Sequence, residues 1–141
     1  MIDRNNISDR VVLPLESMAY IHDSFIGKDT TIKEFVVIGI ARIGRKCTIE
    51  AFCHIPPGTQ IEDNVYIGPH VTITSKWHPT PEEPIRVKSK VVTVKKGARI
   101  GAGSILTAGV TVGENAEIGE GMTITYDVPD GASLTLKKSQ G

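Results

Sequence analysis

An aliphatic residue returns at every sixth position along most of the chain, and this period restricts the fold more than any other feature. Before a break near residue 75 the series is Ile26, Ile32, Ile38 and, after one five-residue step, Ile43, Ile49, Ile55, Ile61, Ile67 and Ile73. After the break it is Val94, Ile100, Leu106, Val112, Ile118 and Ile124. Amphipathic helices return apolar residues at three and four positions, and half-buried strands at two. The period therefore predicts very short strands separated by corners.

Two other positions of each repeat are restricted. Glycine often follows the aliphatic residue, as at Gly27 and Gly44, and we expect it to allow the positive φ that a sharp corner can demand. Four positions after the aliphatic residue lies a small or β-branched residue that would fit the narrow space at the turn. Cys47 and Cys53 occupy this position in successive repeats. They fall at different corners, so the sequence predicts two buried free thiols and no disulfide.

The pattern [Leu/Ile/Val]-Gly-x-x-small-x resembles that of the hexapeptide-repeat acyltransferases over about residues 21–128. The resemblance implies an all-β fold, a left-handed parallel β-helix with three hexapeptides per turn. The left hand comes from the resemblance alone, since the general rule for parallel crossovers favours the opposite hand. About five coils are expected, beginning at Ile26, Ile43, Ile61, Val94 and Val112. We expect one domain, in which residues 1–20 form an N-terminal cap and residues 129–141 a C-terminal tail.

Charge and hydropathy limit the kinds of partner that this chain is expected to have. Lys plus Arg and Asp plus Glu number 16 each, so there is no basic excess to neutralise a phosphate backbone, and no nucleic acid partner is expected. The first 20 residues contain no apolar signal-peptide region, and no segment approaches the ~18 apolar residues of a membrane span. The sequence predicts a cytoplasmic protein without a membrane partner.

The break in the period predicts an excursion loop over about residues 75–91. Between Ile73 and Val94 lie many more residues than one hexapeptide needs, and long loops are commonly functional or disordered. Prolines stiffen this one at positions 79, 81 and 84. A solvated Pro-rich loop without function is the alternative.

The residues entering the loop resemble those of the galactoside, maltose and nodulation-factor O-acetyltransferases. In that branch I-G-P-N-V-x-I is followed by four residues and then H-P. Here I-G-P-H-V-T-I ends at Ile73, and His78-Pro79 follows at the same distance. The resemblance places His78 on the catalytic histidine of the family, in a cleft between subunits of a homotrimer. Trp77 is a candidate wall for a sugar face. Ser75 and Lys76 stand where a second branch, the nucleotide-sugar 3-N-acyltransferases, has recognition residues, so they are candidate contacts of the acceptor.

A histidine suits this chemistry, because a neutral imidazole can take the proton of a sugar hydroxyl as it attacks the thioester of acetyl-CoA. A surface histidine in a polar loop is the alternative interpretation. His70 stands where both branches commonly have asparagine, and it either orients the acceptor or points outward. His54 is expected at an exposed corner, stacked over Thr72.

The second branch, the nucleotide-sugar 3-N-acyltransferases, matches more of the chain. Tyr20-Ile21-His22-Asp23-Ser24 looks much like its Y-I-H-E-S start, and residues 57–69 resemble its middle. Its T-N-D-x-x-P-R segment corresponds to residues 74–80, where the Asn, Asp and Arg are missing. An uncharged amine needs no strong base, so in this branch His78 would be a binding residue.

The segment after the loop is where such enzymes bind the donor, acetyl-CoA. The resemblance implies that pantetheine lies beside Gly101, Ala102, Gly103 and Ala108. These residues are equally interpretable as corner residues of any such prism. The tail resembles that of the uridyltransferases that make UDP-N-acetylglucosamine, so Lys137 and Lys138 are candidate contacts of the 3′-phosphate. Lys95 and Lys96 are alternatives for that role.

Two other functions remain as alternatives. A non-catalytic trimeric β-helix scaffold would fit the missing Asn, Asp and Arg. A γ-class carbonic anhydrase would bind zinc through histidines. In that family the zinc ligands are separated first by a long gap and then by a short gap of five, whereas His54, His70 and His78 lie 16 and 8 residues apart. No metal is expected, and the sequence favours an acetyl-CoA-dependent acetyltransferase that acts on a sugar or nucleotide-linked sugar.

Overall fold

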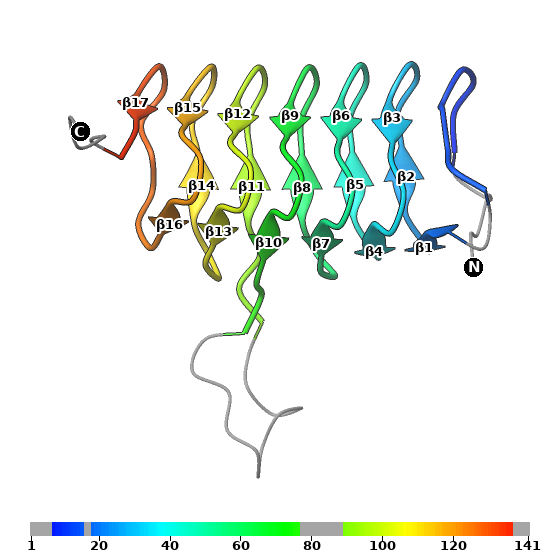
Figure 1. Cartoon of the computed structure of the whole chain (residues 1–141), viewed down its shortest axis with the longest axis horizontal. Helices are drawn as coiled ribbons and strands as arrows, with labels where there is room; N and C mark the ends of the chain where they lie inside the picture. The colour runs from blue at the N-terminus through cyan, green and yellow to red at the C-terminus, as the bar shows by residue number, and fades with distance from the viewer. Residues whose placement is uncertain (1–6, 16–17, 77–88, 137–141) are drawn as a thin grey trace, which may run out of the picture.

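The computed structural model describes residues 7–15, 18–76 and 89–136, and these residues form a left-handed parallel β-helix, which confirms the predicted fold. Strands of two or three residues line up in three parallel sheets along the length of the prism (Figure 1). Except at the two ends of each sheet, every strand pairs with the strand one coil earlier and the strand one coil later. The sheets are named A, B and C below, in the order in which each coil visits them.

Sheet A has six strands, β1 (Tyr20–His22), β4 (Val37–Gly39), β7 (His54–Ile55), β10 (Thr72–Ile73), β13 (Ile105–Leu106) and β16 (Thr123–Ile124). Sheet B has five, β2 (Phe25–Ile26), β5 (Arg42–Ile43), β8 (Gln60–Ile61), β11 (Thr93–Val94) and β14 (Thr111–Val112). Sheet C has six, β3 (Thr31–Ile32), β6 (Thr48–Ile49), β9 (Tyr66–Ile67), β12 (Arg99–Ile100), β15 (Glu117–Ile118) and β17 (Ser133–Leu134).

The core is a set of aliphatic columns inside the prism. In most strands the first side chain points outward and the second is buried, so the residue that repeats every six positions is the inward one. Ile26 pairs with Ile43, and Ile43 pairs with Ile61, so like side chains stack from coil to coil. Burying one such side chain stabilises the fold by about 1.5–3 kcal/mol. The period of six is thus the period of core positions.

Glycines after the inward residue have a different role from the one predicted. The φ prediction for these glycines is wrong, because Gly27 and Gly44 do not have positive φ. A Cβ at Gly27 would lie 2.5 Å from the backbone carbon of Gly44 in the next coil, closer than real Cβ atoms come. These glycines are required because successive coils approach closely where the strand ends.

Positive φ instead occurs two positions later, at the bend itself. The bends between sheets B and C, named the polar corner, use Asp29, Lys46, Asn64, Gly97, Asn115 and Gly131. The bends between sheets C and A, named the aromatic corner, use Phe35, Phe52, His70, Gly103 and Gly121. Both corners therefore repeat one left-handed residue per coil, but with different side chains.

Cys47 and Cys53 are free and buried, as predicted. Each follows the left-handed residue of its corner and points into the prism. Burial raises the pKa of both thiols, for Cys53 to about 11. The thiolate is the reactive form of cysteine, so the fold keeps both side chains inert.

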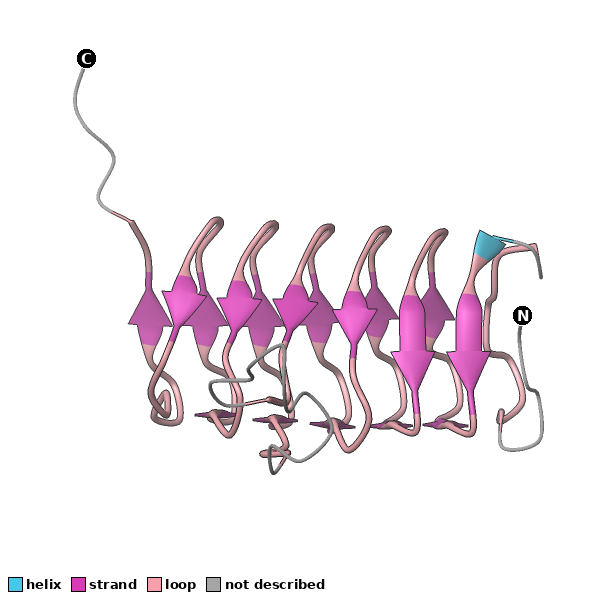
Figure 2. Cartoon of the chain, turned by 90° about the horizontal axis from the view of Figure 1, so that it is seen from below, coloured by secondary structure: helices cyan, strands magenta, loops and turns pink. Residues whose placement is uncertain are grey.

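The excursion is present where the break in the period predicts it. Tyr66 pairs with Arg99 whereas Arg99 pairs with Glu117, so the coil between residues 66 and 99 contains the additional residues. In the sequence these residues lie between β10 and β11, which Figure 1 labels. Figure 2 shows the same prism turned by 90° and seen from below. At the root, Lys76 forms an antiparallel bridge with Ser89. The regular coils resume without a change of register.

Candidate functional site

A hollow lies at the root of the excursion on the outer face of sheet A. Its volume is about 480 Å³, and it is lined by His54, Pro56, Thr72, Ile73, Thr74, Ser75 and Lys76. Ser75 accepts a hydrogen bond at its carbonyl oxygen from the Lys90 N–H, at 2.8 Å. This bond and the Lys76–Ser89 bridge hold the two arms of the excursion together next to the hollow. Two residues predicted to contact the acceptor, Ser75 and Lys76, are therefore brought to one cavity.

His54 also lines this cavity, which sequence reasoning missed. Its exposed position is confirmed, and it pairs with Thr72 in the neighbouring coil. The Nδ1 atom of His54 lies 3.3 Å from the carbonyl oxygen of Ile73. In a neutral ring a hydrogen bond there requires the proton on Nδ1, which leaves Nε2 as an acceptor. The coil spacing was the signal that could have found His54, since it places position 54 beside position 72.

Ala108 lies one coil further along the same edge of sheet A. Gly109 donates a backbone hydrogen bond to the Lys90 carbonyl at 3.1 Å, which ties the turn at Ala108 to the returning arm of the excursion. The Ala108 side chain is only 7% exposed. Of the predicted donor residues that the structure describes, Ala108 is therefore the one that lies near Ser75.

The other described donor residues lie at the opposite end of β10, next to His70. Gly103 donates a backbone hydrogen bond to the Pro69 carbonyl at 2.9 Å, and Ala102 accepts one from Gly121 at 2.8 Å. Since extended chain rises about 3.3 Å per residue, His70 and Ser75 are separated by roughly 15 Å along the chain. The predicted residues thus form two groups, at the two ends of one strand.

His70 is exposed and stacks on Phe52, with ring centroids 4.8 Å apart and an interplanar angle of 7°. Phe52 in turn stacks on Phe35, at 5.1 Å and 22°. Across the same corner, on sheet C, a second hollow of about 360 Å³ includes Tyr66, Arg99 and Gly101. His70 and Gly101 therefore flank one edge of the prism.

Gly101 has a structural requirement that involves no ligand. A Cβ there would lie 2.6 Å from the backbone nitrogen of Glu120 and 2.6 Å from the carbonyl carbon of Gly119. Gly103 differs, because within the described ranges no atom beyond its own chain neighbours lies within 4 Å of its Cβ position. At this corner the backbone is therefore more accessible to a ligand at Gly103 than at Gly101.

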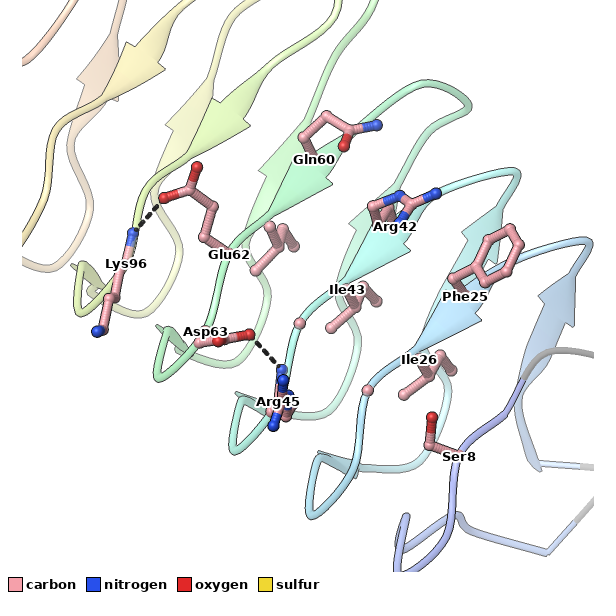
Figure 3. A pocket seen from close by; sticks show the side chains of 13 residues that line it. Ser8, Phe25, Ile26, Arg42, Ile43, Arg45, Gln60, Glu62, Asp63 and Lys96 are labelled. Atoms are coloured by element: carbon pink, nitrogen blue, oxygen red, sulfur yellow. Dashed lines mark hydrogen bonds between the residues drawn. The ribbon is translucent and has the colours of Figure 1, made fainter.

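A third and larger hollow, about 560 Å³, lies on sheet B and the polar corner (Figure 3). It contains Lys96, one of the alternative phosphate contacts. Its carboxylates are already used by the backbone: Asp63 accepts the Arg45 N–H at 2.8 Å and Glu62 accepts the Lys96 N–H at 3.0 Å. Arg42 lies over the Phe25 ring, 4.8 Å from its centroid. Charges of both signs line this surface, so it does not define an anion site.

Four predicted residues, Trp77, His78, Lys137 and Lys138, lie outside the described residues. Within the described ranges there is no group of three or more His, Cys, Asp or Glu side chains that could hold a metal ion. The same ranges contain no helix that is both long and apolar enough to cross a membrane.

Two family models match the chain on either side of the excursion. Residues 40–75 match "Bacterial transferase hexapeptide (six repeats)", and residues 91–126 match "Hexapeptide repeat of succinyl-transferase". Together with the three-sheeted prism, these matches define a hexapeptide-repeat protein. The chain belongs to the hexapeptide-repeat acyltransferase superfamily, as the sequence pattern predicts.

Known relatives and solved structures agree with this class. The bifunctional protein GlmU of Brevibacillus brevis is 38% identical over 99% of this chain and 28% of its own length, and that of Nitrosomonas europaea is 30% identical over 82% and 31%. The chain thus spans less than a third of these relatives.

Among solved structures, a mutant of AntD, an N-acyltransferase from Bacillus cereus in complex with dTDP and coenzyme A, has a TM-score of 0.78 and 22% identity, covering 89% of this chain and 75% of AntD. The acetyltransferase domain of PglB from Neisseria gonorrhoeae has a TM-score of 0.73 and 18% identity, covering 87% and 53%. At these identities the likeness shows the fold.

Proposed function

We propose that this protein is an acetyl-CoA-dependent acetyltransferase that transfers an acetyl group to a hydroxyl or amino group of a sugar or nucleotide-linked sugar. The observation that carries the proposal is the hollow at the root of the excursion, where His54, Ser75 and Lys76 meet on a hexapeptide-repeat prism. The solved N-acyltransferase of similar fold, AntD, is in complex with dTDP and coenzyme A, which supports a CoA donor and a nucleotide-linked acceptor.

For a hydroxyl acceptor, the reaction needs a base. An imidazole nitrogen accepts the hydroxyl proton while the oxygen attacks the thioester carbon of acetyl-CoA. Collapse of the tetrahedral intermediate breaks the carbon–sulfur bond, and the proton passes from the imidazolium to the leaving CoA sulfur. His78 is the base in this proposal, and the Nε2 atom of His54 is a second candidate because of its Nδ1 contact with the Ile73 carbonyl.

For an uncharged amine acceptor, the nitrogen lone pair attacks the thioester carbon directly, the carbon–sulfur bond breaks, and the leaving CoA sulfur takes the proton that the nitrogen loses. The histidines then serve to bind and orient the acceptor. Ser75 and Lys76 would contact the acceptor, with Trp77 as a wall for a sugar face and His70 as an orienting residue. Pantetheine would follow Ala108, Ala102 and Gly101, with Lys137 and Lys138 at the 3′-phosphate.

The test is an assay of thiol release from acetyl-CoA with a panel of free sugars and nucleotide-linked amino sugars. Release that depends on one acceptor class supports the proposal and names the class. If no acceptor gives release and the protein also fails to bind CoA, the proposal is wrong and a scaffold role is favoured.

Histidine variants separate the roles once an acceptor is known. If His78 is the base, His78→Ala lowers kcat by about 10²–10⁴-fold, whereas His54→Ala does so if that residue is the base. His22→Ala serves as the matched control, because His22 belongs to the first coil, away from the hollow. Full activity of both the His78 and the His54 variants would exclude each of these two residues as an essential base and favour direct amine attack.

A homotrimer in the cytoplasm is also part of the proposal, because the hollow is open on the outer face of a single prism and a neighbouring subunit would close it. Sedimentation of the full chain measures the oligomeric state directly. A monomer at the concentrations used in the assay would contradict the trimer.

A further inference from the structure

The side chains of the aromatic corner form a stack that ends half-way along the prism. Phe35, Phe52 and His70 occupy the same corner position in three consecutive coils, with nearly parallel rings. The next two coils have Gly103 and Gly121 at that position, and no other part of the described chain comes within 4 Å of either Cβ position. The face of the His70 ring that is turned away from Phe52 therefore borders the open space beside Gly103, which is called the open step below.

The two phenylalanines are held in an unfavourable backbone conformation. Phe35 has φ of 58° and Phe52 of 65°, where a bulky side chain is an outlier that costs about 1–2 kcal/mol. Burial does not explain the choice, since the two side chains remain 51% and 52% exposed. Strained residues that stay at the surface point to a role other than stability.

We propose that the open face of His70 binds the purine or pyrimidine ring of a nucleotide, stacked above Gly103 as the next member of the series. This rests on the proposed function, in which a nucleotide enters either as the carrier of the acceptor sugar or as the adenosine part of CoA. The 4.8 Å spacing and 7° angle between Phe52 and His70 show that the corner already holds flat rings face to face. A further ring of the same kind extends that arrangement.

A nucleobase fits this step because stacking on an aromatic side chain stabilises a bound base by about 1–3 kcal/mol without requiring edge recognition. Gly103 and Gly121 leave room for the ring over two successive coils. The phosphates would meet Arg99, which begins β12 on the neighbouring sheet C face. The Arg99 side chain is 69% exposed, and its ion pair with Glu117 is long, 3.7 Å.

The test measures binding of UDP, dTDP, ADP and CoA to the full chain by calorimetry, with ribose 5-phosphate and pyrophosphate as base-free probes. We expect at least one base-containing probe to bind at least tenfold more tightly than either base-free probe. Preference for UDP or dTDP assigns the ring to the acceptor, and preference for ADP and CoA assigns it to the donor. Equal affinity for base-free and base-containing probes would overturn the proposal.

Variants of His70 identify the stacking surface. His70→Ala should weaken base-dependent binding about tenfold, within the range expected for one stacked base, whereas His70→Phe should retain it because a flat ring is kept. His22→Ala is the matched histidine control and should not change the affinity. If His70→Phe binds as weakly as His70→Ala, the proposal is wrong.

Two readouts keep this proposal separate from the proposed activity. Nucleotide binding is measured without turnover, so a protein that binds bases but releases no thiol supports the stacking site and contradicts the acetyltransferase. If His70→Ala changes the oligomeric state in sedimentation and leaves base binding intact, the stack is a subunit contact and the nucleotide site is excluded.

Discussion

The polar corner and the aromatic corner make the same bend with different residues. Both place one left-handed residue in each coil, and both link consecutive strands with similar backbone hydrogen bonds. At the polar corner all the left-handed residues except Lys46 are Asp, Asn or Gly, which tolerate positive φ well. At the aromatic corner Phe35 and Phe52 tolerate it poorly. The bend therefore requires a left-handed backbone conformation in every coil. Tolerance of that conformation does not explain the phenylalanine side chains at the aromatic corner.

The aromatic corner itself changes character along the prism. Its first coils present rings, and the last two present Gly103 and Gly121 with open space above them. At the polar corner, by contrast, a Cβ added at Gly97 would collide with the Asn115 amide. Among the described residues, Asn115 fills the space beside Gly97 at the polar corner, which is open at Gly131 in the last coil, whereas the aromatic corner is open at both Gly103 and Gly121. Four experiments at and beside these two corners follow from this difference in packing.

The largest effect is expected where two coils approach each other beside the aromatic corner. Gly101→Ala should lower the free energy of unfolding by about 3 kcal/mol, since its Cβ meets fixed backbone of Gly119 and Glu120 and overpacking has costs of this size. Urea denaturation measures it. Gly103→Ala is the control, with an expected loss of only about 1 kcal/mol for positive φ. Equal losses would show that the close approach at Gly101 is not limiting.

The next effect concerns the thiol that follows the aromatic corner. The folded pKa of Cys53, about 11, lies above its ordinary value of 9.0 because burial disfavours the thiolate. The folded state then binds the proton more tightly than the unfolded state, so this contribution is complete below pH 9 and is lost as pH rises toward 11. Between about pH 8 and about pH 10.5 the loss should be about 2 kcal/mol.

Urea denaturation at both pH values, for the wild type and for Cys53→Ala, isolates this contribution because other groups titrate equally in both proteins. The variant should show a smaller decrease in stability at high pH. An identical decrease would mean that the Cys53 thiol does not resist ionisation in the fold.

A smaller difference is expected when the two corners are compared directly at glycine. Gly97→Ala and Gly103→Ala both place a Cβ at positive φ, 75° and 71°. Only the first must displace a neighbouring side chain, that of Asn115. Gly97→Ala should therefore be about 1 kcal/mol less stable than Gly103→Ala in thermal or urea unfolding. The opposite order would show that the step at Gly103 is occupied.

The smallest effect on stability is expected from removing a ring. Phe52→Gly loses stacking worth about 0.5–1.5 kcal/mol and relieves backbone strain of about 1–2 kcal/mol, so the net change should lie between a loss of about 0.5 and a gain of about 1.5 kcal/mol. Calorimetric unfolding measures the change, and Asn64→Gly at the polar corner is the matched control. A loss of several kcal/mol for Phe52→Gly would make the stack a structural element of the prism.

Much of the fold could be predicted from the sequence because the repeat is local and each hexapeptide encodes its own inward residue. The excursion was predictable as well, since residues 74–93 interrupt the period. The role of the glycines could not be read in this way. Gly27 and Gly101 follow the aliphatic residue as a corner glycine would, but their requirement comes from the neighbouring coil, about 18 residues away.

The residues of the candidate site also divide into those that the sequence predicted and those that only the neighbouring coils reveal. Ser75 and Lys76 were predicted from the resemblance of the segment that enters the excursion, and both line one hollow in the structure. His54 was assigned to an exposed corner, which is correct, but its place in that hollow depends on the neighbouring coil. The predicted residues also separate into two groups, because His70 and Ser75 lie at opposite ends of β10.

The sequence by itself determined the coiled architecture, the inward columns and the position of the excursion, because these follow from spacing along one chain. Only the tertiary structure decided which residues of different coils become neighbours. His54 joins Ser75, and His70 stacks on Phe52 beside an empty Gly103, because parallel strands bring equivalent positions of successive coils within about 5 Å. Stacking across coils, which no single repeat encodes, is what creates the surfaces for binding.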